Sequence, residues 1–289
     1  MSSYFLFYNL GNTCYLNTAL QCLYTNTVLC EIFKKPLKTC ITVSYLYISL
    51  YNMYSFLFNK KEENITDNTT CMYFLQDIYK HYCNKYNIQR HSPEDSLECF
   101  IRLIDTCLVY DNDNNEDTSL SVLYSKINNV LTFPCCKHVI TKNELFLSLD
   151  LCYNTNTSTL HKNNNIMELL SFFFKETIVY NTECDKCNLK VNILHQYRLI
   201  KISPLLLLNL SLGPLENENI EICTEILLDN TVYTLNSIGL YTGGHYLSIV
   251  QDRKEKHVYH IISDYSILHT YTSINGTILK NIKFMIYSL

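Results

Sequence analysis

A change of hydrophobic period near residue 125 constrains the fold of this 289-residue chain more than any other feature. Before it, apolar side chains recur every three or four positions, as in helices; after it, short apolar runs resemble strands. The helical segments are 12–24, 41–58 and 71–83, and the strand-like segments are 130–133, 144–151, 205–210, 233–239, 245–250, 258–262 and 282–286. Helices followed by strands in one chain are typical of the α+β class.

Local signals divide the chain further. Ser92, Pro93 and two following acids predict a helix start, with Ser92 as the cap and Pro93 at the first helical position. Two polar loops and one more helix are expected at 111–118, 154–165 and 166–176. We find no internal repeat and no linker long enough to separate independent domains, so we expect a single domain over residues 1–289.

Charge and cysteine usage exclude several classes of function. The net charge is −4 and the pI is about 6.1, which favours neither nucleic acid nor an anionic membrane as partner. The 14 cysteines are scattered and residues 1–9 lack a secretory signal, so we expect a reducing compartment, the cytoplasm or nucleus. Segment 41–58 is uncharged but interrupted by polar residues and slightly short for a membrane span, so we expect a buried core helix.

Cys14 lies at the predicted start of the first helix, directly after Asn12 and Thr13, either of which can cap it. Unpaired N–H groups and partial positive charge at a helix N-terminus stabilise a thiolate. We therefore expect the pKa of Cys14 to fall and the thiol to be a candidate nucleophile. The alternative is a packed, inert cysteine.

A possible base for this thiol comes late in the chain. Gly243 and Gly244 permit unusual backbone torsions directly before His245, which begins an apolar strand. Cysteine hydrolases are built from a thiol and a histidine that are distant in sequence, although a structural histidine at a hairpin is the alternative. Asp264, at the end of the neighbouring strand, is placed to orient the imidazole.

A metal site is suggested by two pairs of residues about fifty positions apart. Cys184 and Cys187 form a CxxC pair, and Cys135 with His138 forms a CxxH pair. Together they offer four ligands of the kind that hold structural zinc. Cys136 competes: it could replace Cys135 or simply pack. The alternative to zinc is a hydrophobic cysteine cluster.

Several of these motifs together resemble one enzyme family. NLGNTCYLNTALQCL at 9–23 is similar to the Cys box of the ubiquitin-specific proteases, and GGHYLSIV at 243–250 to their His box. Weaker similarities lie at 94–98, 166–175, 202–210 and 284–287. The resemblance covers essentially the whole chain. It implies a papain-like fold with a helical thumb over about 1–125 and a palm over about 126–289, which carries zinc-tipped β-fingers around 130–200.

The resemblance also implies roles for single residues. Cys14 would be the nucleophile and His245 the general base. Asn9 would donate to the oxyanion. Asp95 and Glu98 would hold arginines of the ubiquitin C-terminal tail. The expected partners are thus ubiquitin and ubiquitinated proteins.

The chain departs from the family at the third triad position. Relatives usually show Asn or Asp followed by Asp, whereas this chain has Ser263 and Asp264. We expect Asp264 to orient the histidine, with Ser263 or a Cys–His dyad as alternatives. Gly243 and Gly244 would border the channel for the ubiquitin tail. Two other functions are left open: a ubiquitin-binding module without catalysis, and a protease for another ubiquitin-like modifier.

Overall fold

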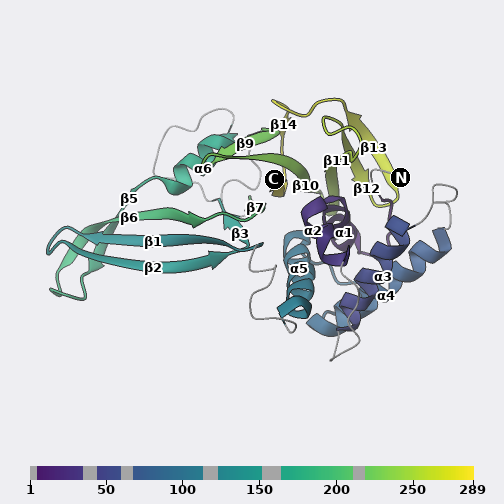
Figure 1. Cartoon of the computed structure of the whole chain (residues 1–289), viewed down its shortest axis with the longest axis horizontal. Helices are drawn as coiled ribbons and strands as arrows, with labels where there is room; N and C mark the ends of the chain where they lie inside the picture. The colour runs from purple at the N-terminus through teal and green to yellow at the C-terminus, as the bar shows by residue number, and fades with distance from the viewer. Residues whose placement is uncertain (1–4, 35–43, 60–67, 113–122, 152–163, 211–218) are drawn as a thin grey trace.

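The computed structural model describes residues 5–34, 44–59, 68–112, 123–151, 164–210 and 219–289 (Figure 1). Within them the chain follows the predicted order, with helices first and strands later. The helices of the first part are α1 (Cys14–Thr25), α2 (Thr27–Lys34), α3 (Tyr45–Asn59), α4 (Asn68–Tyr86) and α5 (Ser96–Asn112). They form the thumb. The mixed α+β fold predicted from the sequence is confirmed.

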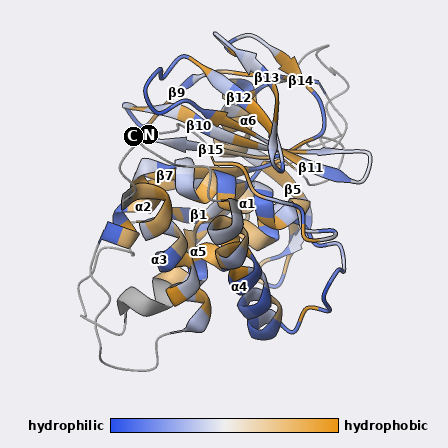
Figure 2. Ribbon diagram, turned by 90° about the vertical axis from the view of Figure 1, so that its right-hand side faces the viewer, coloured by the Kyte–Doolittle hydropathy of each residue, from blue (hydrophilic) through white to orange (hydrophobic). Residues whose placement is uncertain are grey.

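α1 is the central helix of the thumb, and each of its residues is buried. It packs against α2 and α5 and against two strands of the palm, which explains why even its polar side chains are inaccessible. In Figure 2 much of α4 is hydrophilic whereas α5 is largely hydrophobic, consistent with α4 lying at the outside of the thumb.

α3 is the segment for which a membrane span was considered. Leu46, Tyr47, Leu50 and Met53 on it are almost completely buried in the thumb core, so the predicted core helix is confirmed. Among the described residues, no helix combines the length and the apolar character needed to cross a membrane.

The palm is a mixed sheet whose strands follow the order β13-β12-β11-β10-β15-β7-β3, with β9 paired to β10. These strands are β3 (Ser148–Asp150), β7 (Leu205–Asn209), β9 (Glu225–Leu228), β10 (Thr231–Thr242), β11 (His245–Gln251), β12 (Tyr259–Ser263), β13 (Ser266–Tyr271) and β15 (Ile282–Ser288). Among the described strand pairs of this sheet, only β3–β7 is parallel.

The central strands are apolar on both faces because both faces are covered. Leu205 and Leu207 of β7 belong to the thumb core, whereas Leu206 and Leu208 belong to a second core. That second core includes residues of α6 (Ile166–Phe174). Gly239 of β10 allows the close approach of Phe284, since an added Cβ would lie 2.2 Å from the Phe284 ring.

The fingers are a separate antiparallel sheet of order β2-β1-β6-β5 that projects away from the thumb (Figure 1). Its strands are β1 (Ser125–Phe133), β2 (His138–Phe146), β5 (Thr177–Glu183) and β6 (Lys190–Lys201). A third, small sheet joins β14 (Ile278–Leu279), β8 (Ile220–Glu221) and β4 (Asn164–Asn165).

Some sequence-based boundaries differ from the structure. The helix predicted to start after Ser92 begins at Ser96, because Asp95 is the residue whose side chain accepts from the first free N–H groups. The strand predicted at 144–151 is divided between β2 and β3. The predicted polar loops lie mostly outside the described residues; residues 111–112 close α5 and residues 164–165 form β4.

Candidate active site

The loop before α1 is shaped by the side chain of Asn9. Asn9 Oδ1 accepts from the backbone N–H groups of Gly11 at 2.9 Å and Thr13 at 3.2 Å. Thr13 Oγ1 in turn accepts from the Leu10 N–H at 2.8 Å. Thr13 is the residue before the helix, but its side chain makes no capping bond to α1. The N–H groups at the start of α1 are therefore left facing the Cys14 side chain.

Cys14 is 8% exposed at the first position of α1. Burial raises the pKa of its thiol; N–H groups of Tyr246, Tyr15 and Cys14 itself act in the opposite direction, and the Asp264 carboxylate adds to the increase. The predicted fall in the pKa of Cys14 is thus wrong, because desolvation outweighs the helix N-terminus. At neutral pH the thiol needs a base to ionise.

His245, the predicted base, begins β11 and directly precedes Tyr246, whose N–H faces Cys14. Its Nε2 lies 3.0 Å from Ser263 Oγ and 3.7 Å from Asp264 Oδ2. The first distance is that of a hydrogen bond, whereas the second is that of a charge pair without one. Both candidates for the orienting residue therefore flank the same ring nitrogen.

Asp264 joins the two ends of the chain. Its Oδ2 accepts from Asn9 Nδ2 at 3.1 Å, its Oδ1 accepts from Asn17 Nδ2 at 2.6 Å, and its carbonyl oxygen accepts from the Phe7 N–H at 3.1 Å. Its backbone has a φ of 48°, a left-handed conformation that an aspartate adopts more readily than most residues. The carboxylate of Asp264, whose side chain is 9% exposed, is thus held by Asn9 and Asn17, and its backbone by Phe7.

A cleft of about 260 Å³ between thumb and palm leads to Cys14. We call it the thumb–palm cleft; it is lined by Asn12, Cys14, Tyr15, Pro93, Glu94, Asp95, Tyr241, Gly244 and Tyr246. Tyr246 crosses from palm to thumb, since its hydroxyl donates to Asp95 Oδ2 at 3.2 Å. Asp95 Oδ1 caps α5 by accepting from the N–H groups of Leu97 and Glu98.

The other predicted substrate-binding residues are arranged unequally around this cleft. Glu98 does not line the cleft and forms an ion pair with Arg102, which also lies 3.5 Å from Glu94. Gly244 lines the cleft but Gly243 does not. The two glycines make the turn between β10 and β11 with φ of 58° and 100°, a two-residue hairpin that requires positive φ at both positions.

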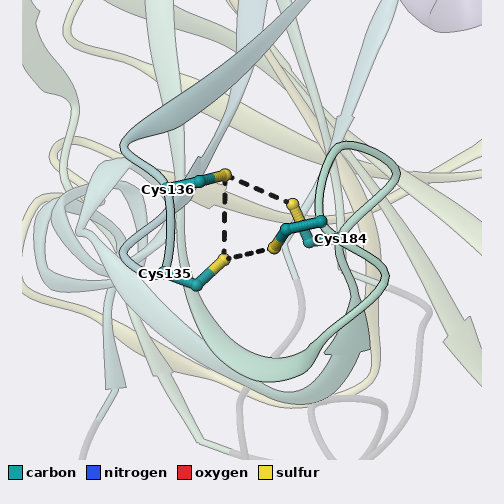
Figure 3. A group of neighbouring side chains, drawn as sticks. Cys135, Cys136 and Cys184 are labelled. Atoms are coloured by element: carbon teal, nitrogen blue, oxygen red, sulfur yellow. Dashed lines mark hydrogen bonds between the residues drawn. The ribbon is translucent and has the colours of Figure 1, made fainter.

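Four cysteine sulfurs gather at the tip of the fingers (Figure 3). They belong to Cys135, Cys136, Cys184 and Cys187, and all lie within 4.8 Å of one another. The predicted ligand set is wrong at one position, because Cys136 takes the place of His138 in this cluster. His138 instead begins β2, with its ring 6.0 Å from that of Phe133.

The sulfur positions fit a tetrahedral metal. Four thiolates at about 2.3 Å from zinc would be separated by about 3.8 Å. The observed Sγ–Sγ distances are 3.9 Å for Cys135–Cys136, 3.6 Å for Cys136–Cys184 and 3.3 Å for Cys135–Cys187. Burial opposes ionisation of Cys184, but N–H groups of Lys186 and Cys187 and the neighbouring thiols lower its pKa to about 7. The donor set is thus suited to a divalent ion that prefers thiolates.

Comparison with known proteins identifies the relatives of this chain. The family model of the ubiquitin carboxyl-terminal hydrolases matches residues 7–280. The chain belongs to the ubiquitin carboxyl-terminal hydrolase family. This hydrolase is therefore a cysteine-type deubiquitinase, as the Cys and His boxes predicted. No curated protein sequence matches it.

Solved structures similar to this hydrolase share its fold at low sequence identity. The SAGA DUB module of Ubp8, Sgf11, Sus1 and Sgf73 bound to monoubiquitin contains a chain with a TM-score of 0.76 and 18% identity, over 99% of this chain and 69% of that one. The module bound to ubiquitin aldehyde contains a chain with a TM-score of 0.74 and 18% identity, over 99% of this chain and 70% of that one. The yeast module with a variant Sgf73 contains a chain with a TM-score of 0.72 and 18% identity, over 99% of this chain and 68% of that one.

Sequence reasoning missed three residues that this hydrolase places around its thiol. Glu94 lines the thumb–palm cleft, Tyr246 spans it, and Asn17 holds Asp264. Asn17 lies one helical turn after Cys14, so a polar side chain at this spacing from the thiol was an available signal. The contact of Tyr246 with Asp95 joins residues 151 positions apart, and no local pattern predicts it.

Proposed function

We propose that this hydrolase cleaves the bond after the last glycine of ubiquitin through a thioester on Cys14, with His245 as base. The observation that carries the proposal is that the Cys14 thiol lines the cleft and lies near the Tyr246 N–H and the Asp264 carboxylate, while His245 contacts Ser263 and Asp264. Thiol, imidazole and carboxylate in one site make up the machinery of cysteine acyl transfer.

The raised pKa of Cys14 defines the first step. A thiol that keeps its proton at neutral pH attacks only when a base removes that proton. Because His245 Nε2 is directed at Ser263 and Asp264, its Nδ1 is the nitrogen that takes the proton from Cys14. The imidazolium then returns the proton to the leaving amine, and water hydrolyses the thioester.

Two groups support this transfer. Asp264 stabilises the imidazolium by charge, while Ser263 fixes the ring orientation by its hydrogen bond. Asn9 Nδ2 has two hydrogens, of which one is donated to Asp264, and the other serves the oxyanion. Such a donor contributes about 2.7–4 kcal/mol to lowering the barrier.

The thumb–palm cleft would hold the ubiquitin tail. Its acids Glu94 and Asp95 suit a basic peptide, and its small volume suits a tail ending in glycines. A larger hollow of about 600 Å³ lies where the fingers meet α6 and β3, lined by aromatic side chains such as Phe146, Phe173 and Tyr197. We assign the body of ubiquitin to that side of the molecule.

A zinc ion bound by Cys135, Cys136, Cys184 and Cys187 would close the tip of the fingers. When bound, it supplies structural cross-linking and no catalytic chemistry. We further propose a cytoplasmic or nuclear location, since fully reduced thiols are needed both at Cys14 and at this cluster. Fractionation of cells that express the tagged protein tests the location.

The test of the function is a ubiquitin whose C-terminus carries an electrophile. We expect one adduct per protein, mapped to Cys14 by mass spectrometry, and no adduct after Cys14→Ala. Correctly folded protein that forms no adduct would favour the alternative of a binding module. Parallel probes made from other ubiquitin-like modifiers decide which modifier is the substrate.

A further inference from the structure

A second cavity lies beside residues 9–13, the loop directly before Cys14, which we call the nucleophile loop. It has a volume of about 540 Å³ and is lined by Asn9, Leu10, Met72, Gln76, Tyr79, Lys80, Arg90 and His91. We call it the α4 basin, because four of these residues lie on α4. The proposed function does not use it.

The charge of the α4 basin is opposite to that of the thumb–palm cleft. Its lining includes the permanent cations Lys80 and Arg90 together with His91, and no carboxylate, whereas the cleft is lined by Glu94 and Asp95. Among the described residues, neither Lys80 nor Arg90 forms an ion pair with an acid. Asp77, on the same helix, is directed instead to Ser49 and His81.

The position of the α4 basin relative to Cys14 is fixed by hydrogen bonds. Asn12 Nδ2 donates to the His91 carbonyl oxygen at 2.9 Å, and His91 Nδ1 lies 3.3 Å from the Gly11 carbonyl oxygen. The His91 N–H donates to the Tyr79 hydroxyl at 2.6 Å, which joins the same loop to α4. The basin is thus held rigidly against the loop that carries the nucleophile.

The direction in which the ubiquitin tail enters determines on which side of Cys14 the leaving group lies. If the ubiquitin tail enters through the thumb–palm cleft, the chain beyond the scissile bond leaves on another side of Cys14. Asn9 and Leu10 line the α4 basin and belong to the nucleophile loop, and α4 and the fingers lie on opposite sides of α1 (Figure 1). The basin therefore lies along the path of the departing protein.

We propose that the α4 basin binds carboxylate side chains next to the modified lysine of the protein from which ubiquitin is removed. The proposal rests on the proposed function, and it gives the substrate a chemical class: ubiquitin joined to a lysine within an acidic segment. Two unpaired cations beside the reaction centre favour such a segment through charge complementarity, which salt weakens.

The experiment compares two conjugates in which ubiquitin is joined to the lysine of a short peptide. In one peptide glutamates flank the lysine, and in the other glutamines replace them. We expect the kcat/KM of the wild-type protein to be about 10-fold higher for the glutamate conjugate at low ionic strength, and this ratio to fall with added salt.

Substitutions of Lys80 and Arg90 test whether the α4 basin causes the preference for the glutamate conjugate. Lys80→Glu/Arg90→Glu should bring the ratio below one, and Lys80→Ala/Arg90→Ala should bring it close to one. Lys256→Glu, at an exposed turn between β11 and β12 that does not line the basin, should keep the wild-type ratio. Labelling with the ubiquitin electrophile counts the active sites of each variant, so that misfolded protein does not affect the ratio.

The outcomes separate the two proposals. A wild-type ratio near one, or a ratio that Lys80→Glu/Arg90→Glu leaves unchanged, would overturn the role of the basin even if both conjugates are cleaved. Failure of the wild-type protein to cleave ubiquitin joined to a small fluorophore would instead overturn the proposed function.

Discussion

The catalytic centre and the finger tip both join segments that are distant in sequence, but by different means. At the centre, the Asp264 carboxylate accepts from Asn9 and Asn17, and the parts that meet belong to the thumb and palm cores. At the tip, the buried cluster of the described residues is Phe133, Cys184 and Ile193, with Leu131, Ile140 and Val191 partly buried against it, and the four sulfurs lie within 4.8 Å of one another. The two regions thus differ in how much buried apolar surface holds their segments together.

This comparison indicates that the two regions are stabilised by different interactions. The centre is preorganised by protein packing, so single polar substitutions there should affect chemistry more than folding. The tip has too little apolar area to hold its two turns together alone, so an ion should decide whether it is ordered. The following predictions test this division, from the largest expected effect to the smallest.

Cys14→Ala should abolish hydrolysis of ubiquitin conjugates, by about 10⁴-fold or more in kcat, because no other group can form the thioester. Binding of ubiquitin, measured by calorimetry, should remain. The matched control is Cys22→Ala, the same change on the same buried helix two turns further on, which should remain active. More than a few per cent of wild-type turnover by Cys14→Ala would contradict the assignment.

Asp264→Ala should lower kcat by about 100-fold or more, whereas Ser263→Ala should lower it by about 3- to 10-fold. The first change removes the charge beside the imidazolium, and the second removes one neutral hydrogen bond. Both rates are measured per labelled active site at a temperature where the variants are folded. The opposite order would identify Ser263 as the main orienting residue.

Cys136→Ser should reduce zinc affinity by about 100-fold or more, while His138→Ala should leave one zinc per chain. Metal content is measured by mass spectrometry after dialysis. Chelation should raise hydrogen exchange in β1, β2, β5 and β6 but leave α1 and β11 protected. Loss of zinc in His138→Ala with retention in Cys136→Ser would restore the ligand set predicted from the sequence.

Asp95→Asn and Asp95→Ala should both raise KM for a ubiquitin conjugate by about 3- to 10-fold, since each removes a negative charge from the cleft. Only the alanine variant should also lose stability, by about 1 kcal/mol, because asparagine still caps α5. Equal KM for Asp95→Asn and the wild type would show that Asp95 serves the helix alone.

The buried thiols of the thumb should make folding sensitive to alkali. Burial raises the pKa of Cys22 to about 12 and of Cys30 to about 11, from an ordinary value of 9.0. Below pH 9 both states keep these protons; above it the unfolded chain loses them first. The free energy of unfolding should then fall by about 1 kcal/mol per thiol per pH unit. Urea titrations at pH 8 and 10 measure this, and Cys30→Val should reduce the difference.

The sequence predicted the α+β class and the order of helices and strands. It also led us to expect Cys14, His245 and Asp264 in one site; in the structure Asp264 lies 3.7 Å from His245, and the Tyr246 N–H faces Cys14. These features depend on local periodicity and on distinctive motifs, which can be recognised without knowledge of tertiary contacts. α2 was not predicted, although Leu29, Cys30, Ile32 and Phe33 are buried on it at helical spacing and Asn26 caps it by accepting from the Leu29 N–H.

The errors have physical causes that lie outside local patterns. The direction in which the pKa of Cys14 shifts depended on how deeply α1 is buried, and only the packing of thumb on palm determines that burial. The choice between Cys136 and His138 depended on where the turn between β1 and β2 directs consecutive side chains. The hydrogen bond from Tyr246 to Asp95 joins residues of two lobes, so no pattern in the sequence around Asp95 predicts it.

Asn9 and Asp264, which touch in the folded molecule, are separated by 255 positions. During synthesis the thiol therefore leaves the ribosome long before the strand that carries its base. A nascent chain that carries Cys14 but not yet residues 245–264 therefore holds the thiol without the imidazole and the carboxylate that are proposed to ionise it.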